Sequence, residues 1–204
     1  MILLRRYLIY FFIIVLIAVS FTYLSAKLFT KFAYIENDIW RILPSPGDPN
    51  RDIYTRAAVA QYGTFALKKP ESAYFHTDTD IDNQKLNGKC VYKLSGEKIE
   101  ANWWSITAYG SDGYLIYNSE DNYSFNSEEK NIKTAQKFAL SEYYEIFFTG
   151  YVDLLSERDT SNWIKVVGDS NFSLVLRVYL PGEEFFSNLK RVNLPIIEKI
   201  KCTE

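Results

Sequence analysis

The amino-acid sequence predicts a mainly β protein, an antiparallel sandwich or barrel preceded by one apolar helix. From Ser72 onward the dominant hydrophobic period is two, which is the period of a half-buried strand. Short runs rich in β-branched and aromatic residues alternate with Gly, Asp and Asn turn signals, a pattern typical of sandwiches and barrels. The third observation is an uncharged apolar run over residues 7–24. A chain of 204 residues accommodates this helix and one medium domain.

The uncharged run is long enough to cross a membrane. As a helix it measures roughly 27 Å at about 1.5 Å per residue, close to the bilayer core of about 30 Å. Arg5 and Arg6 precede it, which favours an N-terminus in the cytoplasm. A cleavable signal peptide is the alternative, but the run is longer than a usual signal core and the sequence before Ala26 is a poor cleavage site. We therefore expect an uncleaved anchor over residues 7–26, with the rest of the chain exported.

The chain divides into three expected segments. An anchor and juxtamembrane helix cover residues 1–35, and a linker covers 36–51, because LPSPGDPN is rich in turn-forming residues. The β domain is expected to cover residues 52–204.

A short amphipathic helix is predicted within DIYTRAAVAQYG. Asp52 is a suitable N-cap and Gly63 a suitable stop. Ile53, Ala57 and Ala60 fall on one helical face. We expect that face to pack on the β domain.

Two later segments show the strand period most clearly. In NWWSITAY one side is apolar, namely Trp104, Ile106 and Ala108, and the other carries Trp103, Ser105, Thr107 and Tyr109. GSDG then predicts a hairpin turn, with YLIYN as the returning strand. FSLVLRVYL has an unbroken apolar face of Phe172, Leu174, Leu176, Val178 and Leu180. Residues 127–142 fit either a helix or a polar strand pair.

Several motifs together resemble a bacterial family, domain-of-unknown-function family 1214. They are RAAVAQYGTFAL, SAYFHTDTD, LNGKCVYKLSG, ANWWSITAYGSDGYLIYN, NWIKV and FSLVLRVYLP. The strongest is the Trp-Trp strand with its Asp-Gly hairpin and Asn118; the pair Asn162 and Trp163 and the strand around Arg177 support it. The resemblance covers about residues 50–204 and implies a jelly-roll-like β-sandwich. Family 1254 is a domain that often precedes this one; we do not expect it in this chain, which therefore resembles a short, membrane-anchored form.

Three aspartates alternate in HTDTDIDNQ beside the only histidine of the chain: Asp78, Asp80 and Asp82 beside His76. An EF-hand loop starting there needs Gly at its sixth position and Glu at its twelfth, and the sequence has neither. An adventitious cation site and a metal site using His76 remain as alternatives. The family resemblance favours a structural turn between two paired strands, residues 72–80 and 89–95.

Composition argues against several classes of function. Outside residues 1–31 the chain has 19 basic and 25 acidic side chains, without the basic cluster that nucleic acid requires. Two Cys and one His cannot form a zinc finger, and phosphate-binding glycine motifs are absent. Only His76 could serve as a catalytic base, although acidic pairs such as Glu183 and Glu184 leave a glycosidase open. We expect no catalytic, cofactor or metal residues.

The candidate structural or ligand-facing residues are aromatic, amide or guanidinium side chains: Arg56, Trp103, Trp104, Tyr109, Asn118, Trp163 and Arg177. With Tyr114, Tyr117 and Tyr179, the aromatic residues either line a sugar-stacking face or cover the sandwich. Arg177 either binds an anionic ligand group or pairs with a carboxylate on a neighbouring strand, and we expect the pairing.

Cys90 and Cys202 are expected to form a disulfide, because they are the only cysteines and both lie in the part expected to be exported. The expected location is a bacterial inner membrane, crossed once by residues 7–26, with the C-terminal domain in the periplasm. The expected function is a non-catalytic binding or structural role in the cell envelope, with an envelope protein or glycan as partner. Alternatives are a carbohydrate- or polymer-binding module and an enzyme acting on an envelope polymer.

Overall fold

The computed structural model describes residues 2–62, 67–97, 99–117, 122–128, 143–149, 162–166 and 170–203. The elements, in chain order, are α1 (Ile2–Ala33), β1 (Ile35–Asn37), β2 (Trp40–Ile42), α2 (Ile53–Tyr62), β3 (Ser72–Thr77), β4 (Cys90–Glu97), β5 (Ala101–Gly110), β6 (Ser124–Asn126), β7 (Tyr143–Thr149), β8 (Trp163–Lys165), β9 (Phe172–Pro181), the 3-10 helix η4 (Glu183–Phe186) and β10 (Ile196–Cys202).

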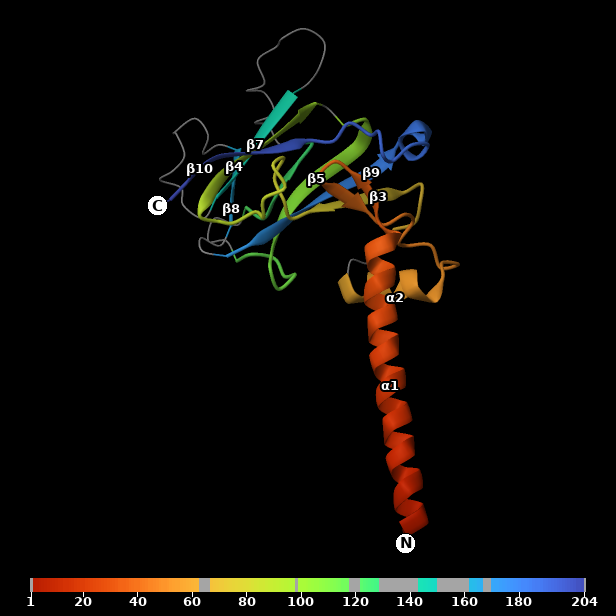
Figure 1. Ribbon diagram of the computed structural model, residues 1–204. Helices are drawn as coiled ribbons and strands as arrows, with labels where there is room; N and C mark the ends of the chain where they lie inside the picture. The colour runs from red at the N-terminus through yellow and green to blue at the C-terminus, as the bar shows by residue number, and fades with distance from the viewer. Residues whose placement is uncertain are drawn as a thin grey trace.

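The strands of the described residues form two sheets that enclose one core. The larger sheet has the order β1-β2-β3-β9-β5-β6, and the smaller has the order β10-β4-β7-β8. Neighbouring strands are antiparallel except for the parallel pair β7 and β8. The predicted mainly β sandwich is thereby confirmed, and Figure 1 shows the two sheets as the body of the molecule.

Alternate side chains of β5 and β9 point into the core, as the sequence pattern predicts. Trp104 is 3% exposed, and its in-phase neighbours Ile106 and Ala108 are also buried. The predicted apolar face of β9 is buried from Phe172 to Val178, but Leu180 is 54% exposed. Leu180 has a φ of 46°, which lies in the left-handed region and ends the alternation there.

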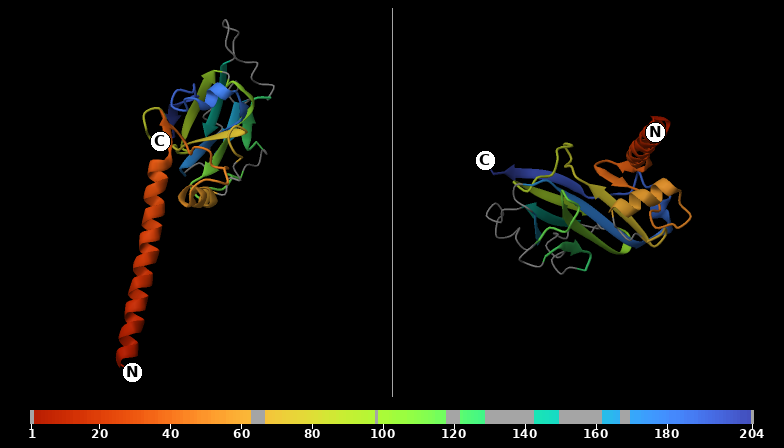
Figure 2. Two further views of the ribbon diagram at one scale, coloured as in Figure 1. Left: turned by 90° about the vertical axis from the view of Figure 1, so that its right-hand side faces the viewer. Right: turned by 90° about the horizontal axis from the view of Figure 1, so that it is seen from below.

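Helix α1 projects away from both sheets as a straight rod with the N-terminus at its far end (Figure 1, Figure 2). Its segment Leu3–Phe29 is long and apolar enough to cross a membrane and is not buried against the domain; a signal sequence satisfies the same test. The predicted apolar helix is therefore present, and it continues without a break to Ala33.

The expected linker over residues 36–51 contains part of the sheet. β1 and β2 form a hairpin, and β2 pairs with β3 through Arg41 opposite His76. Trp40 is 1% exposed, and its indole Nε1 donates to the carbonyl of Pro195 at 2.7 Å. Residues 36–42 thus belong to the sandwich, although the two strands are too short to show a period.

Helix α2 begins as predicted but turns its other side inward. Asp52 is the N-cap: its Oδ1 accepts from the amides of Tyr54 and Thr55, each at 3.0 Å. The hydrogen bond from the Thr55 hydroxyl, followed by that from its amide, lowers the pKa of the Asp52 carboxyl. Thr55 and Ala58 are buried, whereas the face expected to pack on the domain, which includes Ile53, is exposed.

One predicted strand pairing is wrong, and a second is present only as a single bridge. β3 pairs with β2 and β9 in the larger sheet, and β4 pairs with β7 and β10 in the smaller one, so residues 78–89 connect the two sheets. The turn after β5 is present, with Gly113 at a φ of 82°. However, the YLIYN segment makes one isolated bridge, Tyr109 to Leu115, and β5 pairs instead with β6. Residues 129–142 lie outside the described residues.

The predicted disulfide between Cys90 and Cys202 is present and joins the ends of β4 and β10. The two residues face each other directly, with their Cα atoms 3.8 Å apart. The flanking amide of Thr203 donates to the carbonyl of Lys89, which marks a non-hydrogen-bonded pair, the kind in which facing side chains are closest. The bridge therefore closes β10 onto the sandwich.

Candidate binding face on the six-stranded sheet

The outer side of the larger sheet carries a band of aromatic, hydroxyl and guanidinium groups, which we call the arginine face: Tyr74, Trp103, Thr107, Tyr109, Arg177 and Tyr179. Adjacent strands β3, β9 and β5 supply these side chains, and the pleat directs them away from the core. The face is only partly open, since Arg177, Trp103, Tyr109 and Tyr179 are half-buried and Tyr74 and Thr107 are buried.

Arg177 lies at the centre of this face. Its strand position is opposite Tyr74 on β3 and Ser105 on β5. Its Nη1 donates to Thr107 Oγ1 at 3.0 Å, its Nη2 donates to the Tyr109 hydroxyl, and its guanidinium lies 5.5 Å from the Tyr109 ring centroid. In the described residues, two hydroxyls therefore stand where a carboxylate partner was expected, and they leave the positive charge uncompensated.

His76 is a neutral neighbour of this charge. Burial, then the positive charges of Arg177 and Arg41, lower the pKa of the His76 imidazole to about 4. At neutral pH the imidazole is therefore uncharged, so the positive charge at the centre of this face is that of Arg177.

An aromatic cluster lies at one end of the arginine face. The rings of Trp103 and Tyr179 are 5.3 Å apart, and those of Tyr74 and Tyr179 are 6.4 Å apart. Burial, followed by the interaction with Tyr74, raises the pKa of the Tyr179 phenol, so this hydroxyl stays protonated. The cluster offers ring faces and phenol hydroxyls next to a guanidinium, a combination suited to sugars and to anionic groups.

The structure brings together three of the predicted ligand-facing residues, Trp103, Tyr109 and Arg177. Trp104 belongs to the core. Trp163 lies on β8 in the other sheet, where its Nε1 donates to the carbonyl of Thr149 at 3.1 Å. Arg56 lies apart from the face, exposed on α2. The remaining predicted residue, Asn118, is outside the described residues, so its place is not assigned.

Tyr74 and Thr107 were not predicted to belong to this face. Thr107 was already in phase with Trp103 and Tyr109, so the alternation contained the signal. Tyr74 could not be placed, because the sequence does not reveal that β3 pairs with β9.

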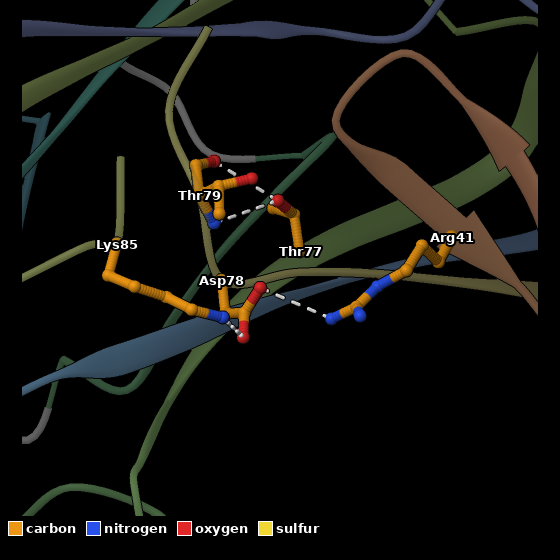
Figure 3. A network of polar contacts seen from close by, with 5 residues as sticks. All are labelled: Arg41, Thr77, Asp78, Thr79 and Lys85. Atoms are coloured by element: carbon orange, nitrogen blue, oxygen red, sulfur yellow. Dashed lines mark hydrogen bonds and ion pairs between the residues drawn. The ribbon is translucent and has the colours of Figure 1, made fainter. Parts of the chain in front are cut away.

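The aspartate stretch forms a polar turn rather than a shared ligand set. Asp78 is held between Arg41, at 3.2 Å, and Lys85, as Figure 3 shows. Asp80 is fully buried, and its Oδ1 accepts from the amides of Asp82 and Gln84 at 3.1 and 2.8 Å. In the part of the chain that the structure describes, no group of three metal-binding side chains is gathered. The carboxylates of Asp78 and Asp80 thus serve different contacts, an ion-pair network and a turn.

A cleft of about 380 Å³ lies between the tip of the β1–β2 hairpin and the start of β10. Its lining residues are Asp38, Ile39, Trp40, Ile81, Asn83, Leu194, Pro195 and Ile196. Among them only Asp38 carries a carboxylate, so the lining does not supply the two facing carboxylates of a glycosidase.

The fold and this face define a class of protein: a disulfide-closed antiparallel β-sandwich that follows a helix able to span a membrane. More particularly, the chain belongs to the family described as protein of unknown function (DUF1214), whose model matches residues 71–183. The match includes the whole arginine face, from Tyr74 to Tyr179, and excludes α1, the β1–β2 hairpin and β10.

The chain is similar in fold to the crystal structure of the VPA0106 protein from Vibrio parahaemolyticus, with a TM-score of 0.55 and 22% sequence identity. The similarity covers 74% of this chain and 36% of the other, so the chain spans about a third of the length of that protein. A search of curated proteins found no match.

Proposed function

We propose that this protein is a membrane-anchored, exported binding module of the bacterial cell envelope, without catalytic activity of its own. α1 is the anchor in the inner membrane, and the sandwich lies in the periplasm, where the arginine face binds an anionic envelope component. The observation that carries the binding proposal is Arg177, a half-buried cation whose partners in the described residues are hydroxyls and a ring.

Two features support export. The disulfide between Cys90 and Cys202 is of a kind that persists in oxidising compartments. Arg5 and Arg6 on the N-terminal side of the span favour retention of that end in the cytoplasm. A signal sequence would also export the domain but would leave it without its anchor.

The chemistry of the face indicates the class of ligand. Arg177 supplies a guanidinium that suits carboxylate or phosphate, while Trp103 and Tyr179 supply ring faces beside it. Because Thr107 and Tyr109 hold the guanidinium in place, the ligand would meet a preorganised cation. We therefore favour an acidic glycan or a similar anionic polymer over a neutral sugar.

The test is binding of acidic and neutral glycans to the full-length protein in detergent micelles. We expect the wild type to bind acidic glycans, and Arg177→Gln to weaken binding by about tenfold or more, the usual effect of losing a charged hydrogen bond. Arg191→Gln is the matched control, because Arg191 is an exposed arginine outside the arginine face. Equal affinity of the Arg177→Gln and Arg191→Gln proteins, or no preference for acidic glycans, would reject the proposed site.

A further inference from the structure

Helix α2 presents its apolar side to the outside of the domain. Ile53 is 75% exposed, and Ala57 and Ala60 are exposed as well. At about 100° per residue these three lie opposite Thr55 and Ala58, which are buried. The domain therefore leaves this helical face uncovered.

The contact between α2 and α1 fixes the height of α2 along the anchor. The rings of Tyr54 and Phe29 are stacked, with centroids 5.2 Å apart and an interplanar angle of 28°. The uncharged stretch between Arg6 and Lys27 measures about 30 Å as a helix, which equals the bilayer core. Phe29 lies only about 3 Å beyond Lys27 along the axis, so α2 is level with the lipid headgroups.

The direction of α2 suits a membrane surface. Figure 1 shows α2 crossing the upper end of α1 at a steep angle, with the sheets above it and the length of α1 below. The views in Figure 2 agree: α2 is seen end-on beside α1 in one, and across the near side of the domain in the view from below. If α1 spans the bilayer, α2 lies in its plane with the uncovered face toward lipid.

A second exposed apolar segment lies on the same side of the molecule. The loop that follows β5, drawn in green in Figure 1, reaches the lower side of the domain as α2 does. It carries Tyr114, Leu115 and Tyr117, which are 76%, 53% and 83% exposed. Tyrosine is enriched at membrane interfaces, and Arg56, exposed on α2, adds a cation suited to anionic headgroups.

We propose that the outward face of α2, assisted by the loop over residues 111–117, docks on the outer leaflet of the membrane that α1 spans. The uncovered face of α2 thus contacts the bilayer surface. Docking holds the sandwich against the membrane in a fixed orientation. This inference rests on the proposed anchor and adds a second point of membrane contact to it.

The test uses the full-length chain in vesicles of phosphatidylethanolamine and phosphatidylglycerol. A polarity-sensitive fluorophore is attached to a cysteine introduced as Ile53→Cys, and quenching by lipids with a nitroxide near the headgroup is measured. The matched control is Ile81→Cys, since Ile81 is 50% exposed and its amide bonds to β10, away from α2. We expect several-fold stronger quenching at position 53 than at position 81; equal quenching would overturn the docking.

A third label separates this inference from the anchor. Leu16→Cys places the fluorophore at the middle of α1, where lipids with a nitroxide deep in the acyl chain must quench it if the helix spans the bilayer. Without quenching at position 16, the anchor and the docking both fail. With quenching at position 16 but none above the control at position 53, the anchor stands and the docking alone is overturned.

Discussion

Trp104 is a large core side chain on the inner side of the larger sheet. It is 3% exposed, lies on β5 between β9 and β6, and packs against Phe125 of β6, with ring centroids 6.1 Å apart. We expect Trp104→Ala to lower the free energy of unfolding by about 3–5 kcal/mol, the usual range for losing a large buried aromatic side chain. Chemical denaturation of the full chain in micelles measures it.

Trp103→Ala is the control for that prediction, because the neighbouring tryptophan is half-buried on the opposite side of the same strand. We expect Trp103→Ala to lower the free energy of unfolding clearly less than Trp104→Ala does. If the two variants unfolded at the same denaturant concentration, the assignment of the two sides of β5 would be contradicted.

His76 makes stability depend on pH. Its pKa is about 4 in the folded protein and about 6.5 in the unfolded chain, because burial and the charges of Arg177 and Arg41 oppose protonation. Between these values the unfolded chain binds the proton and the folded protein does not, so the free energy of unfolding falls as pH falls from 6.5 to 4. The loss due to His76 is at most about 3 kcal/mol.

The measurement compares denaturation of wild type and His76→Gln at several pH values. We expect the variant to lose less stability on acidification, since glutamine takes up no proton. Parallel pH profiles for the two proteins would mean that His76 is not held neutral by its surroundings.

At the scale of single residues, the sequence predicted what depends on local alternation. The buried side of β5, the N-cap Asp52 and the turn at Gly113 were all foreseeable, because each needs only its neighbours in the chain. The partners of Arg177 were not. Thr107 lies on the neighbouring strand, 70 positions away in the sequence, and only the pairing of β9 with β5 brings the two together.

Among the elements, β10 depends on the disulfide more than any other strand described. It is an edge strand that pairs with β4 alone, and the bridge between Cys90 and Cys202 ties its last residues. The bridge closes a loop with a sequence separation of 112 residues. In the chain-entropy model such a loop stabilises the folded state by about 4–5 kcal/mol.

We therefore expect the double variant Cys90→Ala, Cys202→Ala to have a free energy of unfolding lower by about 4–5 kcal/mol or somewhat less. Hydrogen exchange should show the earliest opening in Ile196–Cys202, because β10 loses its covalent link to β4. A free energy of unfolding within a few tenths of a kcal/mol of the wild-type value would mean that strand pairing and the core contacts of Ile197 hold β10 without the disulfide.

Elements with a strong period or a clear turn were predictable, and short or isolated ones were not. β1 and β2 have three residues each, too few to show alternation, and the turn-rich sequence that follows them resembled a linker. The apolar face of α2 was read correctly, but its direction was not. An amphipathic pattern shows that one face is apolar without showing whether protein or lipid covers it.

For the whole molecule, the sequence predicted a sandwich after an apolar helix but not how its strands are shared between two sheets. β3 and β4 follow each other in the chain, yet the turn around Asp80 carries the chain from one sheet to the other. Sandwiches commonly make such crossings, and no local signal distinguishes them from a hairpin. The arginine face arises only from this arrangement.

Every functional inference above requires that the sandwich lies outside the cytoplasm on an α1 that spans the membrane. The most direct test is a fusion of alkaline phosphatase after residue 204, assayed in intact cells, because that enzyme is active only when exported and oxidised. We predict an active fusion that remains in the membrane fraction. On a denaturing gel it should migrate at the mass expected with α1 uncleaved. An inactive fusion would contradict the account, and an active fusion released from the membrane would contradict the anchor.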